Sequence, residues 1–328
     1  MGKRGGCTPV QTERDGTTLS IFFIYGKRLE YILDVRTRLL HHPRAITHDR
    51  EVPRPGACCH PMQETQVLKL KCYSVGDVDT RSSAADATGV RPRMNRLYQT
   101  STMAALLDAV YDGETTLDEL LMHGNFGLGT FNSLDGEMIV NDSVIHQFRA
   151  DGQAGRVPGD LKTPFACVTF FNPEKEYMID TARDKDGFEA IVDQLVNNPN
   201  LFAAVRFTGM FERVETRTVF CQCRPYPPML DVVARQPTMQ LGASTGTMLG
   251  FRTPGYMQGV NVAGYHLHFL TEDGRRGGHV TDYAVLKGRL EVGVISDVEI
   301  QLPRTEQFAR ANLSPENIHE AIRVAEGG

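Results

Sequence analysis

The sequence has 328 residues, of which 41% are hydrophobic and 23% charged, and its formal net charge is −5 at pH 7. This length can bury a substantial core as one or two domains, and no apolar run is long enough to predict a membrane span. We find no convincing signal peptide, so we expect a cytoplasmic globular protein without a membrane partner, although the sequence leaves secretion open.

The first 95 residues differ in charge from the rest of the chain. Residues 1–96 carry 16 Lys and Arg against 10 Asp and Glu, whereas the whole chain is acidic. Only Leu19 to Leu40 is predicted as a possible helix or strand region. Basic charge can serve nucleic acid, but no aromatic interleaving or tight basic cluster supports that partner here. We therefore predict that residues 1–95 are a poorly ordered extension and that the protein binds no nucleic acid.

Clear helix and strand signals begin at Leu97. Ser101-Thr102 can cap a helix over 103–111, and Thr116-Leu117-Asp118-Glu119 is a capping box that opens a second helix ending at 123–124. Hydrophobic periodicity then predicts further elements. These are strands over 126–132, 134–140, 143–148, 163–171 and 202–221, and a helix over 188–197.

Closely spaced prolines in Arg224-Pro225-Tyr226-Pro227-Pro228 predict a boundary, because proline resists helix and central strand alike. This boundary gives a mixed-sheet subdomain over 96–224 and a metal-binding subdomain over 225–328. Beyond it we expect a helix over 231–236, strands over 242–251 and 289–301, a hairpin over 264–283, and a last helix over 314–326. The expected fold class is α/β (α+β), with two mixed β-sheet layers or subdomains and a few helices.

The predicted hairpin carries three histidines. Asp273-Gly274 favours a two-residue type I′ turn, which would set His268 directly across from His279. Because strand side chains alternate, His266 shares the face of His268 and lies diagonal to His279. Three imidazoles with an open fourth position describe a catalytic transition-metal site, most simply zinc (Zn2+).

Several stretches make the chain from Leu97 onward resemble the bacterial α-acetolactate decarboxylases. The most specific are Tyr98-Gln99-Thr100-Ser101-Thr102-Met103, Gly127-Leu128-Gly129-Thr130-Phe131, Leu134-Asp135-Gly136-Glu137-Met138, Thr163-Pro164-Phe165-Ala166 and His266-Leu267-His268. The resemblance implies decarboxylation of 2-acetolactate to acetoin and CO2 in the butanediol and acetoin pathway, and a homodimer. It also implies zinc on His266, His268 and His279, catalytic Glu137, Arg217 and Glu326, and Thr130 as a substrate-binding residue.

The chemistry of this reaction explains why such residues are needed. Loss of CO2 from 2-hydroxy-2-methyl-3-oxobutanoate leaves an electron pair at C2, which must be delocalised onto the ketone oxygen as an enediolate. Zinc chelated by the hydroxyl and keto oxygens is a Lewis acid for that charge. Arg217 would hold the carboxylate before it leaves, and Glu137 and Glu326 are candidates for the stereospecific protonation. Which glutamate delivers the proton stays open.

Other interpretations of the same residues remain. His266 and His268 followed by Glu272 match the spacing of the first cupin motif, which would bind iron or manganese. A fourth protein ligand would instead make a non-catalytic, zinc-stabilised protein. On composition alone, Glu137 reads as a surface carboxylate and Arg217 as a cross-strand ion-pair partner.

Overall fold

The structure is a computed structural model, which describes residues 19–25, 28–35 and 94–326. The chain divides into two compact units, residues 1–82 and 83–328. In the first unit, β1 (Leu19–Tyr25) pairs antiparallel with β2 (Arg28–Val35), so the region predicted as helix or strand contains strands. Most of residues 1–95 lie outside the described part, and their predicted poor order stays a prediction.

The first sheet of the second unit has seven strands in the order β18-β3-β10-β5-β6-β7-β8. All neighbours are antiparallel except β18, which runs parallel to β3, so the sheet is mixed as predicted. The strands, in chain order, are β3 (Arg96–Thr100), β5 (Phe126–Thr130), β6 (Glu137–Asn141), β7 (Val144–Phe148), β8 (Ala154–Arg156), β10 (Ala166–Thr169) and β18 (Asp297–Gln301). A small separate sheet pairs β4 (Thr115–Thr116) with β9 (Lys162–Thr163).

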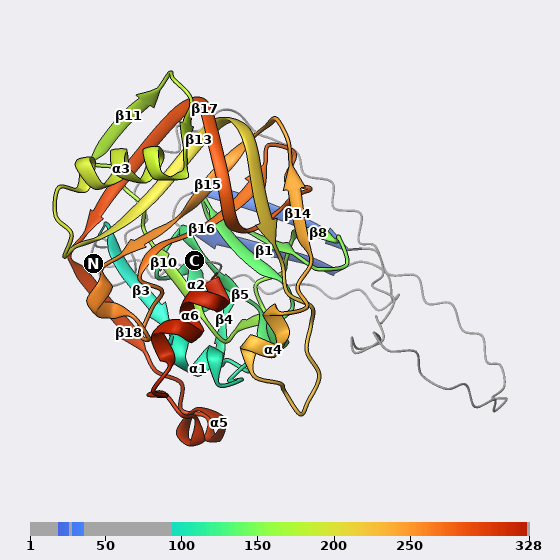
Figure 1. Cartoon of the computed structure of the whole chain (residues 1–328). Coiled ribbons are helices and arrows are strands. Elements are labelled where there is room, and N and C mark those ends of the chain that lie inside the picture. Colours follow the sequence, from blue (N-terminus) through green and yellow to red (C-terminus); the bar gives the residue numbers. More distant parts are fainter. Residues whose placement is uncertain (1–18, 26–27, 36–93, 327–328) are drawn as a thin grey trace, which may run out of the picture. The chain divides into compact units, whose positions relative to one another are not determined.

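Four long strands form the second sheet, and their pairing closes into a ring. They are β13 (Phe202–Arg217), β15 (Ser244–Thr253), β16 (Gly264–Thr271) and β17 (Gly277–Ile295). Each pairs with the next, and β17 pairs back onto β13. β14 (Thr238–Leu241) pairs antiparallel with the end of β13, while β11 (Lys175–Ile179) and β12 (Arg183–Asp184) pair with β17. α3 (Lys185–Val196) lies along this sheet and buries Phe188, Val192 and Val196 against it (Figure 1).

The helices confirm the predicted capping signals but not every boundary. Thr102 caps α1 (Met103–Leu107), which ends earlier than predicted because Ala109 adopts a left-handed φ of 63°. The predicted capping box is present at α2 (Leu117–Leu121). The remaining helices are α4 (Met229–Val233), α5 (Glu306–Arg310), which the sequence did not predict, and α6 (Ile318–Glu326). None of the described helices is long and apolar enough to cross a membrane.

The largest hydrophobic core lies between the two sheets and the helices that cover one end of them. It joins Leu128 of β5 and Ile139 of β6 to Leu249 and Phe251 of β15, and it includes Ile322 of α6. The predicted class, mixed α/β with two sheets and few helices, is confirmed. Strands from both sides of residues 224/225 meet in the closed sheet, while the predicted subdomain division itself stays a prediction.

Candidate active site

The β16–β17 hairpin brings the three histidines together. His268 pairs directly with His279, the register that the sequence predicts, and His266 lies two residues earlier on the same face of β16. One ring nitrogen of each lies within 4.8 Å of the others. All three side chains are buried, with exposed fractions of 7%, 1% and 4% for His266, His268 and His279.

The turn of this hairpin differs from the predicted one. A type I′ turn needs positive φ at both Asp273 and Gly274, and only Gly274 has it, at 67°. Instead, the Gly274 N–H donates to the Thr271 carbonyl at 2.8 Å, and a longer loop separates Thr271 from Arg276. The loop also leaves Glu272 exposed at the tip, so Glu272 does not join the histidines as a cupin-type ligand.

The surroundings of the histidines suit a bound metal ion. The Nδ1 of His268 lies 2.9 Å from the Met138 carbonyl and the Nε2 of His279 lies 3.2 Å from the Glu326 carbonyl. A carbonyl can only accept, so these nitrogens carry the protons and leave Nε2 of His268 and Nδ1 of His279 as free lone pairs. The Nε2 of His268 is buried without a hydrogen-bond partner among the described residues. Such an orphaned acceptor fits a site built for a cation.

Burial also keeps these rings in the form that binds metal. It lowers the pKa of His266 to about 3, with a further decrease from the charge of Arg217, and it lowers the pKa of His268 and His279 well below the usual value. A histidine must be neutral to coordinate a metal through a ring lone pair. Three buried neutral imidazoles therefore form a ligand set that a divalent transition metal fits.

Two carboxyl groups approach the histidines from different elements. Glu137 is the first residue of β6, and its Oε2 lies 3.6 Å from Nε2 of His268. Glu326 is the last residue of α6, and its Oε2 lies 3.6 Å from both Nε2 of His266 and Nδ1 of His279. Glu137 is only 9% exposed, so it is not the surface carboxylate that composition alone suggests, and the Glu326 side chain is only 11% exposed.

Burial dominates the protonation of both carboxyl groups. It raises the pKa of Glu137 to about 8, against the opposing effect of Arg217, while Glu326 raises it further. Burial likewise raises the pKa of Glu326, and Arg217 again lowers it. Glu137 thus holds a proton at neutral pH in the metal-free protein, because a low-dielectric environment disfavours the charged form.

Arg217 ends β13 beside these groups and pairs in register with His279. Its side chain is 4% exposed, its Nη2 lies 3.7 Å from Oε2 of Glu326, and its Nη1 donates to Oε1 of Gln236 at 3.2 Å. Arg213 lies earlier on β13 and forms a surface ion pair with Asp282. Arg217 is therefore directed at Glu326 of the terminal helix and is not the solvent-facing cross-strand partner that composition suggests.

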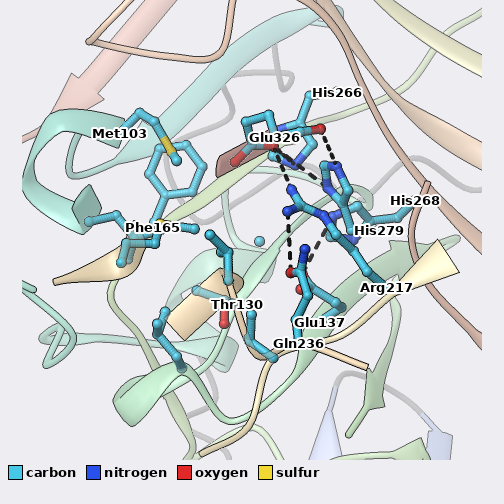
Figure 2. Close-up of a pocket in the computed structure, with 16 residues that line it drawn as sticks. Met103, Thr130, Glu137, Phe165, Arg217, Gln236, His266, His268, His279 and Glu326 are labelled. Carbon is cyan, nitrogen blue, oxygen red and sulfur yellow. Dashed lines mark hydrogen bonds and ion pairs between the residues drawn. The ribbon is translucent and has the colours of Figure 1, made fainter. Parts of the chain in front are cut away.

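The same side chains line one cavity. Thr130 lines it, pairs in register with Glu137, and donates its hydroxyl to the Gly136 carbonyl at 2.8 Å. Figure 2 shows Met103 and Phe165 on one side of the cavity and the histidines, Arg217 and the carboxyl groups on the other.

Sequence reasoning missed one polar residue and an apolar wall. Gln236 follows α4, and the wall includes Met103, Leu106, Phe165, Val219 and Met229. No local pattern marks these residues, because they reach the cavity from α1, α4 and loops that are distant in the chain. Only the resemblance could have pointed to Met103 and Phe165, since both stand inside stretches that carry it.

Comparisons with known proteins relate the chain to one family. A family model described as alpha-acetolactate decarboxylase matches residues 97–315. The alpha-acetolactate decarboxylase of Klebsiella aerogenes is 47% identical over 230 residues, which cover 70% of this chain and 88% of that protein. That of Bacillus subtilis (strain 168) is 40% identical over 234 residues, or 71% and 92%. A crystal structure of the Bacillus subtilis protein aligns with a TM-score of 0.70 and 40% identity, covering 71% of this chain and 100% of that one.

Proposed function

Because the chain belongs to the alpha-acetolactate decarboxylase family, we propose that it is a carbon–carbon lyase that converts 2-acetolactate to acetoin and CO2. The observation that carries this proposal is the convergence of three buried histidines, Arg217 and two carboxyl groups on one cavity. The product, acetoin, would place the enzyme in the acetoin and butanediol pathway.

We propose zinc as the metal, held by His266, His268 and His279. The ligand set is all imidazole, the ring nitrogens converge, and carbonyl groups orient two of the rings, which supports a site that would hold one zinc ion. When bound, such an ion supplies a Lewis acid for the negative charge that develops on the substrate oxygens.

Arg217 would bind the substrate carboxylate. Its guanidinium is buried in the cavity, and its Nε has no hydrogen-bond partner among the described residues. A planar guanidinium can donate two parallel hydrogen bonds to a carboxylate, which fixes the C1–C2 bond in one orientation. Release of CO2 then breaks that bond and leaves its electron pair at C2.

Protonation at C2 would come from one of the two glutamates. In the metal-free protein, burial raises the pKa of Glu137 to about 8, which makes Glu137 a candidate acid. Glu326 reaches the site from α6 rather than from β6, and Figure 2 shows the two carboxyl groups arriving from different elements. A proton delivered from one fixed direction gives a single enantiomer of acetoin. Thr130 supports Glu137 through its hydrogen bond to the preceding carbonyl.

We also propose that the protein is a homodimer and that residues 96–328 carry the activity, with residues 1–95 as an extension. Among the described strands, β11 is an edge strand of the sheet that contains the ring, and it exposes Tyr177 and Met178. An exposed sheet edge with apolar side chains favours pairing with a second copy. The matched region begins at residue 97, and every proposed site residue has a higher number than 97. Light scattering of the full chain, and activity of a chain that starts near residue 94, would test the two statements.

Freshly prepared racemic 2-acetolactate provides the test of function. We expect acetoin formation above the spontaneous rate and in one enantiomer, with loss of activity on chelation and recovery on addition of zinc. If one zinc binds per chain but no acetoin forms above the spontaneous rate, the metal site stands and the substrate assignment fails. If chelation unfolds the chain, the ion is structural, since a catalytic site with an open position should lose activity first.

A further inference from the structure

The side chain of Gln236 contacts the guanidinium of Arg217 inside the cavity. Its Oε1 accepts a hydrogen bond from Nη1 of Arg217 at 3.2 Å, and it lines the cavity together with Val233. Gln236 is half-buried, whereas Arg217 is almost fully buried. None of the roles described above requires a glutamine at this place.

The backbone holds Gln236 in a set position relative to Arg217. The Gln236 N–H donates to the Val233 carbonyl at 3.2 Å, and the next residue, Pro237, accepts from the Thr218 N–H at 3.3 Å. Thr238 then pairs directly with Arg217 in the β13–β14 ladder. The segment that carries Gln236 is therefore anchored to the end of α4 before this residue and to the end of β13 after it.

The separation of Arg217 from Glu326 needs an explanation. An arginine and a carboxylate buried side by side usually form short, parallel hydrogen bonds. Here Nη2 of Arg217 and Oε2 of Glu326 are 3.7 Å apart, and both Nε of Arg217 and Oε2 of Glu326 lack hydrogen-bond partners among the described residues. Gln236 accepts one N–H and adds no negative charge, so it restrains the guanidinium without neutralising it.

We propose that Gln236 is a positioning residue, which holds Arg217 away from Glu326 so that the guanidinium stays available to an anionic substrate. This inference rests on the proposed function, in which Arg217 binds the carboxylate of a 2-hydroxy-3-oxo acid. The neutral amide of Gln236 would thereby allow the site to bind an anion in preference to an uncharged ligand. A carboxylate at position 236 would form an ion pair with Arg217 and so compete with the substrate for the guanidinium.

Two substitutions of similar size separate this role from simple packing. Gln236→Glu keeps the shape and the hydrogen-bond acceptor but adds a charge, and Gln236→Leu removes the acceptor. Gln240→Leu is the matched control, because Gln240 is an exposed glutamine on β14 that bonds Glu215 on the surface. Thermal unfolding of each variant would establish that it is folded. The readouts are KM and kcat for 2-acetolactate, and the affinities of the metal-loaded protein for 2-hydroxy-2-methylpropanoate, an anion, and for acetoin, which is neutral.

We expect Gln236→Glu and Gln236→Leu each to raise KM by about tenfold or more, with a smaller change in kcat, because ground-state binding of the carboxylate is lost. Affinity for the anion should fall by a similar factor, while affinity for acetoin and all properties of Gln240→Leu stay unchanged. Wild-type behaviour of Gln236→Glu would overturn the inference, since a packing or hydrogen-bonding role tolerates that change. If the wild-type protein makes no acetoin, the proposed function fails, and the anion affinities still decide the role of Gln236.

Discussion

The Oε2 of Glu326 lies 3.6 Å from Nδ1 of His279, although Glu326 is the last residue of α6 and His279 belongs to a strand of the closed sheet. This contact depends on how α6 is docked. Its buried residues are Ala321, Ile322 and Ala325, which face α1 and α4. A short helix held by three apolar side chains thus sets the position of one candidate acid.

Shortening the largest of these side chains should move Glu326. Ile322 is 1% exposed, so Ile322→Ala removes buried methyl groups and should weaken the docking of α6 by about 2 kcal/mol or more. We expect decarboxylase activity to fall about tenfold or more. Val324→Ala is the control, because Val324 lies on the same helix and is 49% exposed. Equal activities of the two variants would contradict this dependence on α6.

Removal of one imidazole should abolish stable metal binding. Zinc content per chain, measured by elemental analysis after dialysis, should drop from about one to near zero in His268→Ala, because two remaining imidazoles hold the ion weakly. His319→Ala changes an exposed histidine on α6 and should retain the metal. Full zinc occupancy in His268→Ala would show that the ion binds elsewhere.

The buried Glu137 should contribute less to the stability of the metal-free protein as pH rises. Its pKa is about 8 in the folded chain, whereas the usual value of 4.5 applies to the unfolded chain. Between these two pH values the folded chain keeps a proton that the unfolded chain releases. The contribution of Glu137 to the free energy of unfolding therefore decreases with increasing pH across this window, by at most about 1.4 kcal/mol per pH unit for one group. Glu137→Gln cannot titrate, so its free energy of unfolding should fall less, or rise more, than that of the wild type across this window.

Urea unfolding at pH 5 and pH 8 measures this difference. Glu326, whose pKa burial also raises, contributes in the same direction, whereas the three buried histidines, whose pKa burial lowers, contribute in the opposite direction. Both proteins share these contributions, so the difference between the wild type and the Gln variant reports Glu137. A Glu137→Gln protein with the same pH dependence as the wild type would mean that Glu137 is ionised in the folded state.

Arginine at position 217 should not be replaceable by lysine. Lysine keeps a positive charge near Glu137 and Glu326 but lacks the planar fork that binds a carboxylate through two hydrogen bonds. We expect Arg217→Lys to lower kcat/KM by about 100-fold, because a strong bidentate contact is lost. Arg213→Lys changes an exposed arginine on the same strand and should have little effect. Wild-type kinetics in Arg217→Lys would refute the proposed role.

Local sequence patterns were sufficient for the elements that carry the site. Period-two alternation around Asp273-Gly274 predicts the pairing of His268 with His279, and the structure has that register. Thr102 and the box at Thr116 cap helices as predicted. The patterns failed where longer-range contacts compete with local preference, as at the hairpin tip, where the Glu272 N–H bonds to the Thr245 carbonyl of β15 and the turn opens into a loop.

The sequence by itself thus determined the strand periodicity, the caps and the face shared by His266 and His268, because those depend on neighbours in the chain. Tertiary structure alone decided what surrounds the histidines. Glu137 comes from the first sheet, Arg217 from the end of β13, and Glu326 from the last helix. Their burial, which raises the pKa of both glutamates, and the contact of Gln236 with Arg217 arise only when these distant elements pack together and exclude water.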